Sequence, residues 1–375
     1  MTTRNFKIDT AGQIGSLPVP NRLVRSATAE RLATEHAGRV TPALIDLYRS
    51  LAAGGVGLIV TGHAYVAAAG KAHPEMTGAF CDTLIDGLAT LVTAVHEAGG
   101  LMAMQINHAG RQVDPVLGLQ PLAPSTVPSP APQGFAAARP AREMSHADIV
   151  TAVDAFGHAA RRARSAGFDA VQIHAAHGYL VSQFLSPHTN RRTDAWGGDF
   201  ERRLKFLAAV CEAVRGQVGR DYPVFVKLGM VDNLERLPGG LTLDDGARIV
   251  GRLAALGLDA VEVSSGDGGG TTNFSIRRGV GRRHPEAYFR SLARRARAAT
   301  SLPVILVGGL RTRTTIDEVL ASGDADFIAM CRPLIREPHL PRRLLAGEAT
   351  AAACASCGRC WPSRMGEGIA CKCGG

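Results

Sequence analysis

The stretch IHAAHGYLVSQFLSPHTNRRTDAWGGDFERRLKF, residues 173–206, bears most directly on the fold and the chemistry of this chain. It continues a short apolar run, FDAVQI, of the kind that forms a strand covered on both faces. His174, His177 and Tyr179 follow at the end of that run. At these spacings two imidazoles and a phenol converge on one small volume, where they can bind a developing oxyanion and donate a proton.

Seven more apolar runs are spread along the 375 residues, and helical segments alternate with them. This alternation is the pattern of βα units around a parallel sheet. The eight predicted strands are residues 21–28, 55–62, 100–107, 169–174, 222–229, 259–265, 302–309 and 326–331. Eight strands with intervening helices predict a (β/α)8 TIM barrel, whose active-site residues lie at the carboxyl ends of the strands.

Helix-start signals support this division. Thr41 precedes a proline and opens a predicted helix over 42–54. Ser145 and Asp148 form a capping-box pattern, and Thr242 opens a later helix in the same way. A doubly wound open sheet is the alternative fold. Its dinucleotide fingerprint is absent, because the glycines within residues 266–270 do not open a helix with a following acidic residue.

Residues 117–142 are rich in proline, alanine and serine and interrupt the alternation. They predict a loop and short hairpin inserted after the third strand, near the barrel mouth, with a disordered linker as the alternative. The predicted organisation is a barrel over residues 1–348, followed by a cysteine-rich C-terminal tail over residues 349–375.

The composition is that of a soluble globular enzyme, with 46% hydrophobic and 20% charged residues. No apolar stretch approaches the roughly 20 residues of a membrane span, and the N-terminus lacks an export signal, so we expect a cytoplasmic location. The net charge of +9 comes with only 5% aromatic residues and no nucleic-acid recognition motif. We therefore expect a solvated basic surface that attracts phosphate-bearing cofactors, and no nucleic-acid partner.

Five motifs within residues 173–206 together carry a resemblance to a known family. In order they are H-x-x-H-G-Y-L, Q-F-L-S-P, N-x-R-x-D, G-G and E-x-R-x-x-F. The chain resembles the old yellow enzyme family of FMN-dependent oxidoreductases, as a single-domain relative of the 2,4-dienoyl-CoA reductase barrel. The resemblance runs from about Asn21 to about Leu340, close to the whole barrel.

The resemblance implies an NAD(P)H-dependent ene-reductase acting on a small molecule. Nicotinamide reduces FMN, and flavin N5 then passes hydride to the β carbon of an activated alkene. His174 and His177 become donors to the carbonyl or nitro oxygen, and Tyr179 becomes the proton donor to the α carbon. From the residues alone, a cluster that caps the strand or a metal site are the alternatives.

Other activities fit the same barrel. A flavin-dependent amine dehydrogenase or demethylase is the main enzymatic alternative, with a dienoyl-CoA-reductase-like enzyme beside it. A metal-binding or redox-sensing protein that uses the cysteine tail is the alternative from another class. The sequence leaves open the natural substrate and the choice between NADH and NADPH, and we expect a homo-oligomer.

The resemblance also implies a set of flavin-binding residues after successive strands. The set is Ser26, Ala27, Thr28, Gly62, Gln105, Lys227, Gly308, Gly309, Cys331 and Arg332. The last four match a phosphate site, and Lys227 stands where many relatives have arginine, near flavin N1 and the C2 oxygen. Ala29 departs from the family pattern, which often has threonine or cysteine near N5.

Two further polar groups are assigned by context. Arg111 is expected near the mouth, with contact to substrate, contact to a neighbouring subunit and a surface role as alternatives. Asn190, Arg192 and Asp194 are interpreted as a structural loop that braces the segment after the histidines.

Eight cysteines divide into two groups. Cys81, Cys211 and Cys331 are isolated in apolar contexts typical of buried free thiols. The tail has the spacing C-x2-C-x2-C-x10-C-x-C, and without an export signal we expect no disulfides there. A [4Fe–4S] cluster or zinc site and reduced thiols are equally supported alternatives, and the predicted ligands are Cys354, Cys357, Cys360 and Cys371.

Overall fold

A computed structural model describes residues 6–34, 37–127, 140–235, 237–265 and 276–373. Eight parallel strands form a closed barrel, because β4 pairs with β6 as well as with β3. The barrel strands are β3 (Leu23–Arg25), β4 (Leu58–Val60), β6 (Met102–Asn107), β9 (Ala170–Ala175), β10 (Val224–Gly229), β11 (Val261–Ser264), β12 (Val304–Val307) and β13 (Phe327–Met330). Each lies within a predicted strand, except that β9 extends one residue beyond its predicted end. The (β/α)8 prediction is therefore confirmed.

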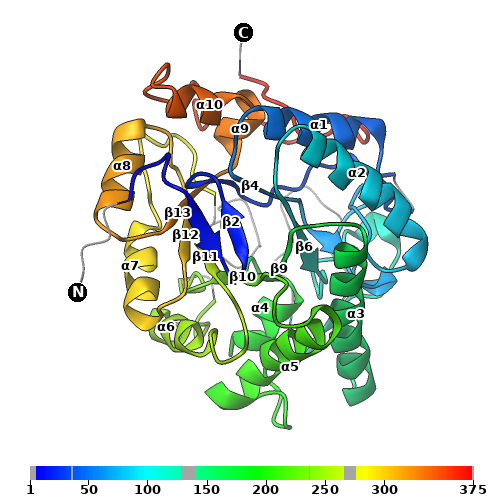
Figure 1. Ribbon diagram of the computed structural model, residues 1–375. Helices are drawn as coiled ribbons and strands as arrows, with labels where there is room; N and C mark the ends of the chain where they lie inside the picture. The colour runs from blue at the N-terminus through cyan, green and yellow to red at the C-terminus, as the bar shows by residue number, and fades with distance from the viewer. Residues whose placement is uncertain (1–5, 35–36, 128–139, 236, 266–275, 374–375) are drawn as a thin grey trace.

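Helices surround the strands as an outer ring (Figure 1). They are α1 (Pro42–Ala53), α2 (Ile85–Glu97), α3 (His146–Ser165), α4 (Leu180–Leu185), α5 (Phe200–Val218), α6 (Leu243–Arg252), α7 (Arg290–Ala299), α8 (Arg313–Ala321), α9 (Arg332–Arg336) and α10 (Leu340–Leu345), with 3-10 turns η1 (Ala68–Gly70), η2 (Asp82–Leu84) and η3 (Pro115–Leu117). The predicted caps are confirmed, since Thr41, Ser145 and Thr242 each accept a hydrogen bond from a backbone N–H in the first turn.

A β-hairpin closes the amino-terminal end of the barrel, and the sequence analysis did not predict it. It consists of β1 (Gly12–Ile14) and β2 (Leu17–Val19), which pair antiparallel and lie in front of the barrel strands in Figure 1. Ile14 and Val19 are fully buried and belong to the same apolar cluster as Phe225 and Phe327 from the barrel strands. The hairpin therefore seals this end, and the opposite, carboxyl end of the strands is left for a site.

The insertion after β6 is only partly described. It contains η3 and a two-residue ladder between β7 (Leu122–Ala123) and β8 (Arg142–Glu143), which pair in parallel and not as the predicted hairpin. The rest of the predicted segment, residues 128–139, lies outside the described residues. The short strand β5 (Ala64–Tyr65) pairs with the end of β6.

The polar loop after α4 braces the segment after the histidines, as predicted, and it also contacts the insertion. The Asn190 side chain donates to the carbonyl oxygens of Phe184 and Trp196, both at 2.8 Å. Arg192 pairs with Asp194 and donates to the carbonyl oxygens of Pro124 and Met144 at 2.9 and 2.7 Å. Both side chains therefore hold one segment against another, and neither lines the cavity described below.

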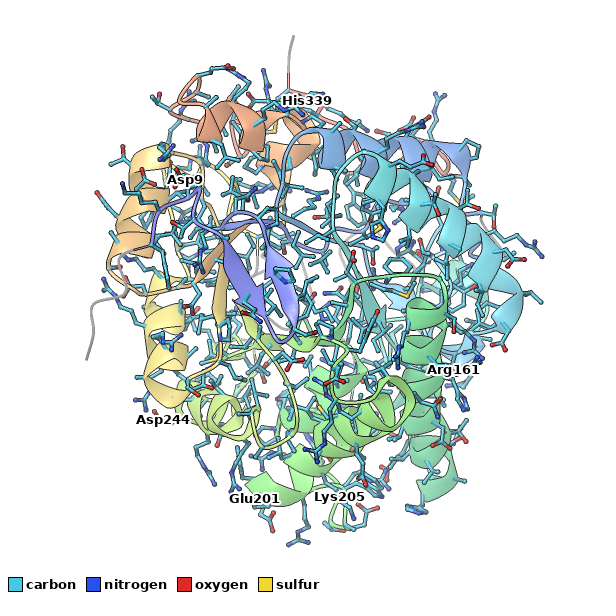
Figure 2. All side chains as sticks on the ribbon, viewed as in Figure 1. Asp9, Arg161, Glu201, Lys205, Asp244 and His339 are labelled. Carbon is cyan, nitrogen blue, oxygen red and sulfur yellow. A yellow bond between two sulfur atoms is a disulfide. The ribbon has the colours of Figure 1, made fainter. Side chains whose placement is uncertain are left out.

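The outer surface carries charged side chains, many of them in ion pairs. Figure 2 labels three of these residues, Arg161, Glu201 and Asp244, at the rim of the molecule. Arg161 contacts Asp82 at 2.7 Å, and Arg252 contacts Glu201 at 2.6 Å. Such exposed pairs contribute little stability. None of the described helices is both long enough and apolar enough to cross a membrane.

Candidate active site

A cavity of about 330 Å³ lies at the carboxyl ends of the barrel strands. Its wall brings together most of the residues that the sequence analysis selected from distant parts of the chain. These are Ala27, Thr28, Gln105, His174, His177, Tyr179, Lys227, Gly308, Gly309, Cys331 and Arg332. Ala29, where the family pattern departs, also lines the cavity.

The three predicted catalytic side chains converge, as their spacing indicated. His174 ends the inward row of β9, and its ring centroid lies 5.1 Å from that of His177 and 4.9 Å from that of Tyr179. His177 reaches this position through a left-handed backbone conformation, with φ of +59°. This conformation is uncommon outside glycine, although histidine tolerates it better than most residues. The turn places Tyr179 at the start of α4, facing the same volume.

Burial keeps both histidines neutral. It lowers the pKa of His174 well below its ordinary value, and the nearby His177, His63 and Lys227 lower it further. His174 Nδ1 accepts a hydrogen bond from the Ala176 amide, so the ring proton is on Nε2 and makes that nitrogen a donor.

His177 is tied to the barrel on its other side. Burial, together with Lys227 and His63, lowers its pKa to about 3. Its Nε2 lies 2.8 Å from the Ser264 hydroxyl of β11. If the serine donates in this bond, the ring proton is on Nδ1, which is then the nitrogen that can donate to a ligand.

Tyr179 is a neutral phenol in this setting. Burial raises its pKa to about 12, which holds the proton on the oxygen throughout the physiological range. Its ring also lies 5.0 Å from the ring of His63. A buried phenol beside neutral imidazoles is a group that can give up a proton only to a strongly basic centre, such as an enolate carbon.

His63 is a cavity residue that the sequence analysis missed. It follows β4, it is buried, and desolvation lowers its pKa to about 4. The Asn107 amide nitrogen lies 2.9 Å from His63 Nδ1, an arrangement that leaves the His63 proton on Nε2. The only signal was a histidine directly after Gly62 in the segment TGHAYV, which is too weak to distinguish from a satisfied core residue.

A buried polar network forms the floor of the cavity. Strand register places Lys227 of β10 beside Glu262 of β11, and its Nζ lies 2.8 Å from Glu262 Oε1. The same carboxylate accepts hydrogen bonds from the Ser26 hydroxyl at 2.5 Å and from Gln172 Nε2 at 2.7 Å. Gln105, directly opposite Gln172 in the register of β6 and β9, donates to Gln172 at 2.6 Å.

The sequence analysis did not select Glu262 or Gln172 as site residues, although both lie inside predicted strands. Polar residues in otherwise apolar strands were the available signal. Glu262 is fully buried, and its charge is balanced by Lys227. The network fixes the Lys227 amino group and the Gln105 amide at the cavity wall.

Ser26 and Gly62 do not line the cavity, although both lie next to it. Ser26 belongs to the buried polar network beneath the cavity, because its hydroxyl accepts a hydrogen bond from Lys227 Nζ at 2.7 Å. Gly62 is needed for a close approach to Glu30: a Cβ there would lie 2.1 Å from Glu30 Oε2, whereas the Gly62 N–H donates to the same carboxylate at 2.7 Å.

The surface role that was one alternative for Arg111 is wrong, whereas its contact with substrate or with a neighbouring subunit stays a prediction. Its side chain is 3% exposed, and it is not among the residues that line the cavity. The segment after β6 turns inward against α4, where the Arg111 amide donates to Gln183 Oε1 at 3.3 Å. A loop that follows a strand looks exposed in sequence, but this one packs against the next helix.

The tail forms part of the cavity wall. Ser356, Gly358, Cys360, Trp361 and Ile369 all line it. Backbone contacts hold the tail on the barrel, since Ile369 donates to the Glu30 carbonyl and Ala352 donates to the Arg311 carbonyl, both at 2.9 Å.

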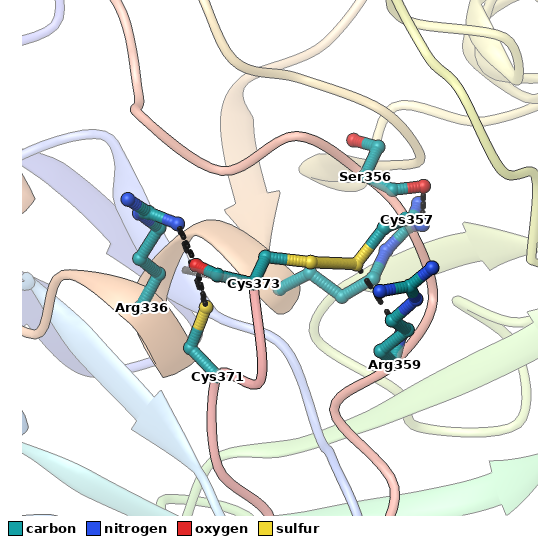
Figure 3. Close-up of a disulfide and its surroundings, with 7 residues drawn as sticks. Arg336, Ser356, Cys357, Arg359, Cys371 and Cys373 are labelled. Carbon is teal, nitrogen blue, oxygen red and sulfur yellow. Dashed lines mark hydrogen bonds between the residues drawn. A yellow bond between two sulfur atoms is a disulfide. The ribbon is translucent and has the colours of Figure 1, made fainter. Parts of the chain in front are cut away.

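One pair of tail cysteines contradicts the expectation of free thiols. Cys357 and Cys373 form a disulfide (Figure 3), because the tail turns back on itself and Arg336 holds the Cys373 carbonyl at 2.6 Å. Cys354, Cys360 and Cys371 are free. In the described part of the chain, no group of three or more metal-ligating side chains is gathered, so the iron–sulfur or zinc site stays a prediction.

The isolated cysteines are also free, but only one of them is fully buried. Cys211 is buried in α5, whereas Cys81 and Cys331 are half-buried. Cys331 is accessible because it stands at the start of α9 and lines the cavity. The expectation of three buried thiols is therefore correct for Cys211 alone.

Comparison with known proteins agrees with this geometry. Residues 12–350 match the model of the NADH:flavin oxidoreductase / NADH oxidase family. The chain belongs to this family. The predicted resemblance to old yellow enzymes is confirmed by a solved old yellow enzyme homologue from Zymomonas mobilis, with a TM-score of 0.78 at 28% identity over 92% of this chain and 94% of that chain.

Two other relatives are longer than this chain. An NADH oxidase of Thermoanaerobacter brockii is 36% identical over 344 residues, which cover 90% of this chain and 50% of the relative. The structure of a 2-naphthoyl-CoA reductase with 2-naphthoyl-CoA has a TM-score of 0.84 at 27% identity, covering 93% of this chain and 54% of that chain. The chain thus spans about half the length of these relatives.

The depressed histidine pKa values predict a loss of stability in acid. Burial lowers the folded-state pKa of five histidines well below the ordinary value. They are His63, His73, His108, His174 and His177. Because the unfolded chain binds protons near pH 6.5 and the folded chain does not, stability falls as the pH drops from about 6.5 toward 4. The expected slope is about 1.4 kcal/mol per pH unit for each histidine.

Glu30 changes the pH dependence of stability in the opposite direction. Burial raises its pKa to about 7, so the folded chain holds this proton between pH 4.5 and 7 and gains stability as the pH falls. Five histidines outweigh one carboxyl, and urea unfolding of the flavin-free protein should show a lower free energy of unfolding at pH 5.5 than at pH 7. Equal values at the two pH values would contradict the neutral histidine cluster.

Proposed function

We propose that this protein is an FMN-dependent NAD(P)H oxidoreductase that reduces activated carbon–carbon double bonds. The observation that carries the proposal is the placement of the neutral His174 and the protonated Tyr179 on one face of the cavity, 4.9 Å apart between ring centroids. One supplies a hydrogen bond to an oxygen and the other supplies a proton to carbon, which are the two groups that this reaction needs.

The residues at the cavity wall fit FMN. Lys227 brings a buried positive charge to the cavity, where it would stabilise negative charge on the pyrimidine side of the flavin ring. Gln105 offers its amide on the same side, while Gly308, Gly309 and Arg332 would hold the phosphate. Ala29 would offer the flavin only a methyl group. When bound, FMN supplies the hydride in this reaction.

The protein side chains carry the remaining steps. His174 Nε2–H donates to the carbonyl or nitro oxygen of the alkene and stabilises the negative charge that develops there as hydride arrives. His177 would donate to the same oxygen through Nδ1 when the Ser264 hydroxyl donates to its Nε2. Tyr179 then transfers its phenolic proton to the α carbon, and its high pKa prevents loss of that proton to solvent.

Replacing His174 with alanine should weaken this oxyanion site. Loss of one donor costs on the order of 2.7–4 kcal/mol in transition-state stabilisation, or about 10²–10³-fold in alkene reduction. Phenol ligands, whose oxygen occupies the same place, should also bind more weakly in absorbance titrations of the flavin. His158→Ala, at an exposed position on α3, is the matched control. Unchanged phenol binding in the His174 variant would contradict the donor role.

Oxidation of an amine on the same barrel is the rival reaction. That reaction has no need for a proton donor facing the substrate carbon, because it removes hydride from the substrate. The protonated Tyr179 beside neutral His174 favours alkene reduction, and transient kinetics with both substrate types separate the two reactions.

A further inference from the structure

A second pocket, of about 570 Å³, adjoins the catalytic cavity. It is lined by Arg278, Gly279, Arg282, Arg283, Ala355, Cys357, Gly358 and Arg359. Gly358 lines both the pocket and the cavity, so the two spaces share a wall. A long ligand that leaves the cavity beside Gly358 would therefore meet this pocket next.

The pocket is strongly basic. Four of its lining residues are arginines, and none is acidic. All four arginines are exposed, and within the described part of the chain they make no ion pair. Several other exposed arginines do have carboxylate partners: Arg252 pairs with Glu201, and Arg295 pairs with Asp244.

Two segments far apart in sequence hold these arginines together. Three arginines belong to the segment after β11, and Arg359 belongs to the tail. The segments are joined where the Gly279 amide donates to the Ser356 carbonyl at 2.9 Å. Arg278 packs so closely on Gly358 that a Cβ there would lie 2.9 Å from its Nε. The cluster is therefore a built feature of the tail against the barrel.

Four like charges around one pocket repel each other, and a multivalent anion placed among them relieves that repulsion. A phosphomonoester carries about −1.5 to −2 charges at pH 7 and presents several acceptor oxygens. The planar guanidinium group binds phosphate oxygens through two parallel N–H bonds, which a lysine cannot reproduce. The chemistry of the pocket thus matches a phosphomonoester better than a single carboxylate.

We propose that this pocket binds the ribose phosphomonoester of an adenosine-containing ligand whose other end lies in the catalytic cavity. Two ligands carry that group: NADPH, on the 2′ oxygen, and an acyl-coenzyme A substrate, on the 3′ oxygen. The proposal rests on the proposed function, because the long ligand must place its nicotinamide or its acyl group at the flavin.

Calorimetric titration of the FMN-loaded protein with adenosine bisphosphates tests the site without turnover. Adenosine 2′,5′-bisphosphate represents the NADPH end, and adenosine 3′,5′-bisphosphate represents the coenzyme A end. We expect Arg282→Gln/Arg359→Gln to weaken binding of one of them by at least about tenfold, an energy of about 1.4 kcal/mol. Arg220→Gln/Arg342→Gln removes two exposed arginines outside the pocket and should leave binding unchanged.

The outcomes divide cleanly. If the pocket variant weakens binding of adenosine 2′,5′-bisphosphate alone, the ligand is NADPH. If it weakens binding of adenosine 3′,5′-bisphosphate alone, the ligand is an acyl-coenzyme A. The proposal would be overturned if the pocket variant weakened binding of adenosine 5′-monophosphate equally. It would also be overturned if the control variant weakened bisphosphate binding as much as the pocket variant does. A fall in FMN content of the pocket variant would also overturn it, because the arginines would then serve the flavin. Since no reduction of an alkene is measured, failure here is distinct from failure of the proposed function.

Discussion

Replacing Tyr179 with phenylalanine should slow alkene reduction by about 10²–10⁴-fold and leave reduction of the flavin by NAD(P)H nearly unchanged. The substitution removes only the phenolic oxygen, and the remaining ring still fills the space beside His174 and His63. The two half-reactions are measured separately by anaerobic stopped-flow absorbance of the flavin.

Tyr222→Phe is the matched control for this variant. Its hydroxyl donates to the Phe168 carbonyl at 2.7 Å and lies outside the cavity lining, so its loss should affect stability and neither half-reaction. Equal slowing of both half-reactions in Tyr179→Phe would show that the residue shapes the cavity and does not supply the proton.

Replacing Lys227 with methionine should both destabilise the fold and impair flavin binding. The side chains of Lys227 and Glu262 are 4% and 0% exposed, so the change leaves a buried carboxylate without its partner. Breaking one side of a buried ion pair costs about 3–5 kcal/mol, which should appear as a lower free energy of unfolding in urea for the flavin-free protein. FMN should also dissociate more readily, because the cation at the pyrimidine side is gone.

The double variant Lys227→Met/Glu262→Gln separates the two effects. It removes both charges, and its stability should recover most of the loss, since the amide oxygen at position 262 still accepts from Gln172 and the amide nitrogen can donate to the Ser26 hydroxyl. Flavin affinity should stay low. A double variant as unstable as the single one would show that the pair is not the source of the instability.

The sequence predicted the barrel because its strands are apolar on both faces and its helices begin at recognisable caps. It also predicted that His174, His177 and Tyr179 meet, since they follow one strand at short spacings. The hairpin β1–β2 was missed because three-residue strands carry no periodic signal, and its burial depends on contacts with distant barrel strands.

Other parts of the site depend on contacts between distant segments and could not be predicted from local patterns. Glu262 lies inside an apolar run, and only the register of β10 and β11 reveals that it faces Lys227. The tail reaches the cavity through single backbone contacts, such as that of Ile369 with Glu30, which leave no trace in the spacing of its cysteines. His63 is a cavity residue because the segment after β4 lies next to Tyr179, with 5.0 Å between the two ring centroids, and no local pattern reports that contact.

The most direct test of the proposed reaction is anaerobic stopped-flow on the purified, FMN-loaded protein. The flavin is first reduced with NADH or NADPH and then mixed with cyclohexenone, and in a separate experiment the oxidised protein is mixed with a tertiary amine. Rapid reoxidation by the enone and no reaction with the amine is the predicted result. Reduction of the oxidised flavin by the amine, with the enone inert, would contradict it.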